Sequence, residues 1–282
     1  AKKCADSPAF PSRELGATSN QRESSKRSAH FLAAMEEPTK EAIADVQAAF
    51  AAEPAAAMMT YKAKSALVDG LSTTLSYPNT PEHGEMAVDE PPVMPGGKDK
   101  GPNPMDLCLA ALGTCQEISY KAFATVMGIE VKSVAAVIEG ELDLRGFLGV
   151  DPNTPMGFSK ITGTVTVDAP DATDEQLAAL KGAVDAHCPM CDFLGGTCTM
   201  TLGLDCKPSE GLAAGNDEGL SAEAIGDLGA ALGADPAAAM VIYKSSSKLE
   251  KGLCTSVTLP NTPHHGPSER RADARHLGTS AS

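Results

Sequence analysis

Residues 103–115, NPMDLCLAALGTC, open an apolar segment that continues to Met127. Pro104 is a residue type favoured in the first turn of a helix, and Gly128 is the type favoured just past a helix end. We therefore predict a long helix over 105–127, and we expect the rest of the domain to be built around it.

Two cysteines share one face of this predicted helix. Cys108, Leu112 and Cys115 are spaced i, i+4 and i+7, which places both thiols on the same side. A cysteine in an apolar helix is commonly a small core residue, so the helix alone makes neither thiol reactive. Cys115 lies well inside the helix, away from the positive end of the helix dipole. A thiolate at this position would need a neighbouring cation or hydrogen-bond donor.

The segments around this helix alternate between strand and helix patterns. Apolar and polar residues alternate in the strand segments, whereas Thr173-x-x-Gln176 is a capping box that begins a second long helix. The predicted elements are a short helix at 41–52, a hairpin at 58–65 and 71–77, strands at 130–144, 159–168 and 197–204, and a helix at 173–188. This order predicts an α+β fold in which an antiparallel sheet wraps around two central helices.

A second cysteine cluster, His187-Cys188-Pro189-Met190-Cys191, follows the second long helix. Cys188 extends the apolar stripe of that helix by one turn. The CxxC spacing suits a redox pair or half of a zinc site, or it is incidental. Zinc needs a second ligand pair, and Cys198 and Cys206 lack CxxC spacing, so we expect neither a metal nor a cofactor.

An internal repeat divides the chain. Residues 55–84 align without gaps to 237–266, an offset of 237 − 55 = 182, and both copies contain a Tyr-Lys pair and the tetrad Pro-Asn-Thr-Pro. The match stops after Gly266, so the second copy repeats only the start of the first. A lone helix and hairpin cannot bury an apolar face, so we expect this partial copy to dock on a sheet edge of its own chain or of another protein.

We expect the chain to consist of five parts. They are a tail at 1–40 that is disordered or derived from a targeting segment, a complete domain at 41–206, a linker at 207–220, a partial repeat at 221–266 and a polar tail at 267–282. The repeat period also suits one piece of a tandem polyprotein.

Composition restricts the possible partners. The 282 residues are 42% hydrophobic with a net charge of −14, so a nucleic acid or an anionic membrane surface would repel the chain. No apolar run is long enough to span a bilayer. Eight cysteines are too few for a disulfide scaffold of this length. We therefore expect a reducing compartment, either the cytoplasm or an organelle matrix such as that of a mitochondrion or plastid.

Five blocks of sequence together resemble the OsmC/Ohr superfamily over about residues 55–205. The blocks are NPMDLCLAALGTC (103–115), MGI (127–129), VIEGELDLRGFLG (137–149), GFSKITGTVTVD (157–168) and HCP (187–189). The resemblance implies an intertwined homodimer whose sheets wrap two central helices. It also implies a peroxidase that reduces organic hydroperoxides and is regenerated by a dithiol reductant.

In this resemblance, the Cys115 thiolate attacks the peroxide and becomes a sulfenic acid, and Cys188 resolves it as a disulfide. Asp106 would orient the site, and Arg145, the one arginine of the matched segment, would stabilise the thiolate. The alternative for Arg145 is a turn residue that pairs with Asp143. The glutamate that peroxidase branches carry ten residues before the reactive cysteine is Met105 here. A second hypothesis is therefore a catalytically idle OsmC-like module that serves as an interaction or accessory subunit of a larger assembly. A lowered Cys115 pKa would favour the peroxidase, and an ordinary or raised one the idle module.

Overall fold

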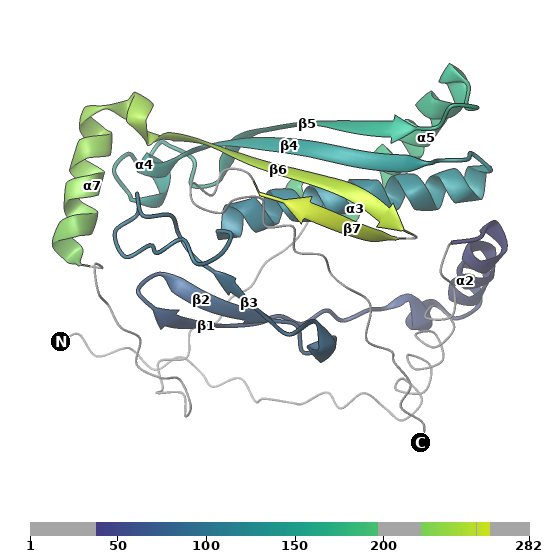
Figure 1. Cartoon of the computed structure of the whole chain (residues 1–282), viewed down its shortest axis with the longest axis horizontal. Coiled ribbons are helices and arrows are strands. Elements are labelled where there is room, and N and C mark those ends of the chain that lie inside the picture. Colours follow the sequence, from purple (N-terminus) through teal and green to yellow (C-terminus); the bar gives the residue numbers. More distant parts are fainter. Residues whose placement is uncertain (1–37, 197–220, 252, 260–282) are drawn as a thin grey trace. The chain divides into compact units, whose positions relative to one another are not determined.

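The computed structural model describes residues 38–196, 221–251 and 253–259 (Figure 1). Residues 44–59 belong to one compact unit, and residues 38–43 and 60 onward belong to another. Helix α2 (Lys40–Ala52) and the short 3-10 helix η1 (Pro54–Ala57) contain no buried residue. The predicted strand at 197–204, the linker, the C-terminal tail and residues 1–37 of the N-terminal tail lie outside the described residues.

Two antiparallel sheets organise the larger unit. The first has the order β1-β2-β3 and consists of β1 (Lys64–Asp69), β2 (Ser72–Ser76) and β3 (Glu85–Val88), with the 3-10 helix η2 (Pro81–His83) before β3. The second has the order β5-β4-β6-β7 and consists of β4 (Ser133–Asp143), β5 (Phe158–Asp168), β6 (Met240–Lys251) and β7 (Cys254–Thr258). The predicted α+β class with antiparallel sheets is confirmed.

Helix α3 (Pro104–Met127) is the central helix predicted from the sequence. The Asn103 side chain accepts hydrogen bonds from the backbone N–H groups of Met105 and Asp106, both at 2.9 Å. Asp106 in turn accepts a bond from the Asn103 backbone N–H at 3.3 Å, which completes a capping box. The helix ends at Gly128, whose φ of 71° is a left-handed conformation that glycine adopts readily. Local chemistry therefore determines both ends of α3.

The second long helix is α5 (Asp174–His187), which is capped by Thr173 as the sequence predicted. It stops one residue earlier than expected, because the backbone of Cys188 is extended and Pro189 cannot continue the helix. A short helix, α6 (Pro189–Leu194), begins directly after this corner. Cys188 therefore lies at a sharp corner between two helices.

The hydrophobic core lies on both sides of α3. One cluster joins α3 to the four-stranded sheet through residues that include Leu109, Ile138 and Tyr243. A second cluster joins α3 to α5 through Tyr120 and Leu180 among others. Figure 1 shows α3 running along one face of the sheet formed by β4, β6 and β7.

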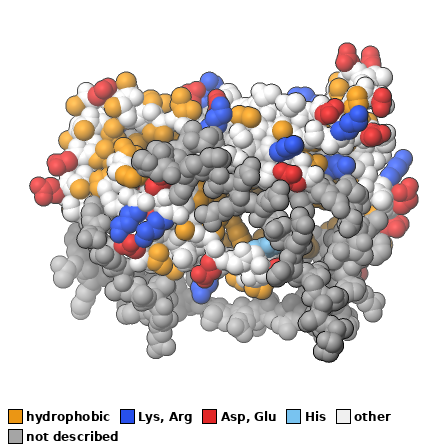
Figure 2. All heavy atoms as spheres, in the orientation of Figure 1, with side chains coloured by type: hydrophobic (Ala, Val, Ile, Leu, Met, Phe, Trp, Pro, Cys, Tyr) orange, Lys and Arg blue, Asp and Glu red, His pale blue; other side chains and the backbone are white. Residues whose placement is uncertain are grey.

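The segment predicted to be a partial repeat supplies two strands of the second sheet, β6 and β7. Helix α7 (Ala222–Ala234) and the 3-10 helix η3 (Pro236–Ala239) precede β6, and α7 contacts the short helix α4 (Leu144–Phe147). Hydrophobic side chains remain on the surface at this end of the sheet (Figure 2). As expected for a hairpin that cannot bury itself, β6 docks on a sheet edge, which is the edge of β4 in the same chain.

Buried Glu117 on α3 makes the stability of this fold depend on pH. Its Oε1 accepts a hydrogen bond from the Ala136 backbone N–H at 3.2 Å, and burial raises its pKa from 4.5 to about 7. The folded protein therefore holds a proton that the unfolded chain releases above about pH 4.5. The stability that the neutral carboxyl contributes is complete below this value and is lost as the pH rises through about 7.

We predict that Glu117→Gln removes this pH dependence. Between pH 4.5 and pH 8 the variant should gain ~1–3 kcal/mol in free energy of unfolding relative to the wild type. Urea denaturation at the two pH values measures this difference. Glu130→Gln, at an exposed position just past α3, is the matched control. Wild type and Glu117→Gln with equal losses of stability over this range would contradict the prediction.

Candidate active site

The described structure brings together two cysteine sulfurs that are far apart in sequence. Cys115 projects from α3 and Cys188 lies at the corner between α5 and α6, and their Sγ atoms are 3.3 Å apart. Both are free thiols, Cys188 being 2% exposed and Cys115 partly buried. A disulfide has a sulfur separation near 2.05 Å, so a small rotation of the two side chains would bring the sulfurs within bonding distance if the pair were oxidised.

The packing of α5 on α3 holds Cys188 in this position. Leu180 and Val184 are fully buried in the cluster that contains Tyr120 of α3. The backbone N–H of Cys188 donates to the Val184 carbonyl at 2.9 Å, and Pro189 then turns the chain. The thiol is therefore held at the end of a helix that is anchored to α3 by two buried side chains, Leu180 and Val184.

Hydrogen bonds decide which sulfur carries negative charge. Burial raises the pKa of the Cys188 thiol, but the Cys191 backbone N–H and the side chains of Cys115, Cys191 and Gln116 donate to its sulfur and bring the pKa below the ordinary value. Burial raises the pKa of Cys115, and its bond to Cys188 raises it further. Of the two sulfurs, Cys188 is therefore the one that loses its proton more readily.

A third sulfur borders the pair. Gln116 Nε2 donates to Cys191 Sγ at 3.2 Å, and Cys191 is exposed. Burial, together with the interaction with the neighbouring Cys188 sulfur, raises the pKa of Cys191 to about 11. The CxxC spacing had indicated that Cys191 could be a partner for Cys188. The contribution of Gln116 had not been predicted, because no sequence pattern marks a polar neighbour of Cys115 as a thiol ligand.

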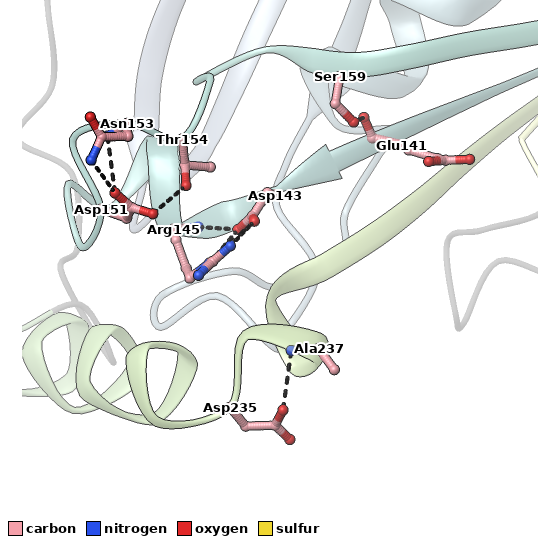
Figure 3. Close-up of polar contacts among 9 residues, drawn as sticks. All are labelled: Glu141, Asp143, Arg145, Asp151, Asn153, Thr154, Ser159, Asp235 and Ala237. Carbon is pink, nitrogen blue, oxygen red and sulfur yellow. Dashed lines mark hydrogen bonds and ion pairs between the residues drawn. The ribbon is translucent and has the colours of Figure 1, made fainter.

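Two other predicted site residues make their contacts elsewhere. Asp106 caps the start of α3, and burial raises its pKa to about 6. Arg145 pairs with Asp143 through Nε at 3.1 Å and Nη2 at 2.6 Å (Figure 3). Neither is joined to the sulfurs by a contact between described residues, and no cation contributes to the pKa of Cys115. Their roles at the thiols remain predictions.

Within residues 38–196, 221–251 and 253–259, no group of His, Cys, Asp and Glu side chains could hold a metal ion. Cys108 is partly buried, and burial raises its pKa. Among the helices in this described part, none is long and apolar enough to cross a membrane.

Comparison with protein families identifies the domain. Residues 97–203 match the family model described as OsmC-like protein, so the chain carries an OsmC-like domain that contains Cys115 and Cys188. The predicted resemblance is confirmed for this range. The partial second copy lies outside the match. No curated protein matches the chain.

Several solved structures are similar to this chain. One is an OsmC-like protein from Mycoplasma pneumoniae, with 17% identity, a TM-score of 0.41, and coverage of 49% of this chain and 89% of that one. Another is an organic hydroperoxide resistance protein OsmC from Legionella pneumophila, with 18% identity, a TM-score of 0.38 and coverage of 49% and 91%. A third is the organic hydroperoxide resistance protein OhrB of Bacillus subtilis, with 20% identity, a TM-score of 0.35 and coverage of 49% and 93%.

We predict that Cys115→Ala makes Cys188 less reactive at neutral pH. The substitution removes a hydrogen-bond donor to the Cys188 thiolate, so the pH at which Cys188 is half alkylated should rise by roughly one unit. Iodoacetamide labelling across pH, read by residue-resolved mass spectrometry, measures this change. Cys108→Ala on the same helix is the matched control. An identical Cys188 profile in wild type and Cys115→Ala would refute the proton-sharing arrangement.

Proposed function

We propose that the chain is a thiol-dependent peroxidase that reduces organic hydroperoxides. The observation that carries the proposal is the 3.3 Å separation of the Cys115 and Cys188 sulfurs inside an OsmC-like domain. Two thiols at this distance can be oxidised in sequence, the first to a sulfenic acid and the pair to a disulfide.

The first step of the proposed reaction begins with transfer of a proton between the two sulfurs. Cys188 accepts the Cys115 proton, which leaves a thiolate on the less buried sulfur. Cys115 Sγ attacks the O–O bond of the hydroperoxide and takes one oxygen, and the alkoxide leaves and receives the proton from Cys188 as an alcohol. The peroxide is thereby reduced by two electrons, and Cys115 is oxidised to a sulfenic acid.

The second step converts the Cys115 sulfenic acid into a disulfide, which is then reduced. The Cys188 thiolate attacks the Cys115 sulfenic sulfur, an S–S bond forms, and hydroxide leaves. A dithiol reductant then reduces this disulfide by thiol–disulfide exchange and is itself oxidised to a disulfide. Such a cycle suits a reducing compartment, either the cytoplasm or an organelle matrix, and needs neither a metal nor another cofactor.

Asp106 and Arg145 enter the proposal as positioning residues. Asp106 acts through the cap of α3, the helix that presents Cys115. Arg145 holds Asp143 in the turn after β4, and its guanidinium would have to leave this carboxylate before it could stabilise a thiolate. The Met190 backbone N–H and the Ser119 side chain, which donate to the Cys115 sulfur and lower its pKa, take the place of a cation in this scheme.

One observation favours a second candidate function. The pKa of Cys115 is raised by burial, which disfavours its thiolate in the resting state. A catalytically idle OsmC-like module, acting as an interaction or accessory subunit of a larger assembly, would show this property. The peroxidase requires the Cys115 proton to move to Cys188 when the substrate arrives, and the idle module does not.

We predict that Cys115→Ser lowers hydroperoxide consumption by about two orders of magnitude or more, because an alcohol is a far weaker nucleophile than a thiolate. Consumption of cumene hydroperoxide in the presence of dithiothreitol measures the rate. Cys108→Ser should behave as the wild type. Cys188→Ser should complete one turnover and accumulate a sulfenic acid that dimedone traps at Cys115. A wild-type rate equal to the background would instead assign the idle module.

A further inference from the structure

Cys191 is a third sulfur beside the reacting pair, and the peroxidase cycle described above does not use it. The buried side chain of Gln116 donates through Nε2 to Cys191 Sγ at 3.2 Å and also donates to the Cys188 sulfur. The Cys191 thiol itself donates a hydrogen bond to Cys188, whose sulfur lies 3.3 Å from that of Cys115. Cys188 is therefore in contact with two other thiols.

The short helix α6 holds these three sulfurs together. It begins at Pro189, so the Cys-x-x-Cys segment starts a helix directly after it ends α5. The backbone N–H of Met190 donates to the Cys115 sulfur, and that of Cys191 donates to the Cys188 sulfur. Residues three apart on one helical turn are neighbours, and the Cys-x-x-Cys spacing is that of redox-active dithiols. Cys188 is therefore placed to form a disulfide with either neighbour.

The three cysteines differ in exposure. Cys188 is 2% exposed and Cys115 is partly buried, whereas Cys191 is exposed. In thiol–disulfide exchange the attacking thiolate must reach a sulfur atom, so access limits the rate. A dithiol reductant reaches Cys191 more readily than the other two cysteines. A disulfide that includes Cys191 would therefore be reduced faster than one between Cys115 and Cys188.

Oxidation of the first pair would also change the reactivity of Cys191. Burial is the largest cause that raises the pKa of Cys191 to about 11, and the interactions with the Cys188 and Cys115 sulfurs follow it. A disulfide sulfur carries no charge, so the charge on these sulfurs is lost once they are joined. The pKa of Cys191 would then fall, and a larger fraction of this thiol would be nucleophilic.

We propose that Cys191 takes over the disulfide from Cys115 and transfers it to the dithiol reductant. This disulfide relay rests on the peroxidase proposed above and extends its last step. The Cys191 thiolate attacks Cys188 Sγ of the Cys115–Cys188 disulfide, and an S–S bond forms between Cys188 and Cys191. Cys115 leaves as a thiolate and takes up the proton that Cys191 released. This exchange moves the disulfide without net oxidation or reduction.

The exposed disulfide is then reduced. One thiolate of the dithiol attacks Cys191 Sγ, the bond between Cys188 and Cys191 breaks, and Cys188 leaves as a thiolate. The second thiol of the reductant attacks the mixed disulfide and releases Cys191. The reductant thereby loses two electrons and becomes a disulfide, and its two thiol protons pass to Cys188 and Cys191. All three thiols of the site are restored.

Disulfide mapping during one turnover tests the relay. The reduced full chain is mixed with one equivalent of cumene hydroperoxide, quenched in acid at intervals and alkylated, and its disulfides are identified by mass spectrometry. The Cys115–Cys188 disulfide should form first and then be replaced by Cys188–Cys191, with Cys115 again open to alkylation. A final disulfide that excludes Cys191 overturns the relay and leaves the peroxidase in place. A wild-type protein that consumes no hydroperoxide overturns both.

Cys191→Ser separates the relay from a packing role, because serine keeps a hydrogen-bond donor next to Cys188. The Cys115–Cys188 disulfide of this variant should persist after turnover, and kcat/KM for dithiothreitol should fall about tenfold, with a smaller effect on kcat/KM for the hydroperoxide. Cys108→Ser, which alters a partly buried cysteine of α3, is the matched control and should behave as the wild type.

Two results with these variants would contradict the relay. Changes of equal size in the two kcat/KM values of Cys191→Ser would show that Cys191 has no separate part in the reduction. Formation of the Cys188–Cys191 disulfide by hydroperoxide in Cys115→Ser would show that this pair is oxidised directly, without Cys115.

Discussion

The burial of α3 between β4 and α5 is the constraint on which the site depends. The cap at Asn103 determines where the helix begins, and Gly128 determines where it ends. Leu109 packs toward the sheet and Tyr120 toward α5, so the helix cannot rotate without opening one of the two clusters. Because α3 packs on both sides, the position of Cys115 along the helix and the direction of its side chain are fixed relative to Cys188.

The two sulfurs work as a unit because each changes the proton affinity of the other. A lone buried cysteine would keep its proton, since burial disfavours the thiolate. At Cys188 a set of hydrogen-bond donors outweighs burial, and Cys115 is one of these donors. The chemistry therefore belongs to the pair, and neither residue can be assigned a reactivity from its own surroundings alone.

Sequence patterns predicted the features of the fold that local chemistry determines. The long helix, its end at Gly128 and the strands β4 and β5 follow from spacing, from Pro104 and Gly128, and from alternation. Patterns were wrong at residues 58–63, which were predicted as part of a hairpin strand but pair with no strand in the described part of the chain. Alternation shows that a segment can pair, whereas the availability of a sheet edge is a property of the folded molecule.

The site was partly predictable for the same reason. The positions of Cys115 and Cys188 follow from helix periodicity and from a family resemblance. The pairing of Arg145 with Asp143, two residues away, was the sequence-based alternative to a role at the thiolate. The donors around Cys188, in contrast, depend on how α6 folds back on α3. Such contacts join segments through geometry that no spacing encodes.

The corner position of Cys188 has a consequence for the whole domain. A covalent bond between the two sulfurs would tie α3 to the end of α5, positions 73 residues apart. The closed ring would contain β4, β5 and α5. Cross-linking a ring of this size restricts the unfolded chain by roughly 4 kcal/mol. The oxidised molecule would thus resist unfolding more than the reduced one. The stability of the domain would therefore rise and fall once in each redox cycle.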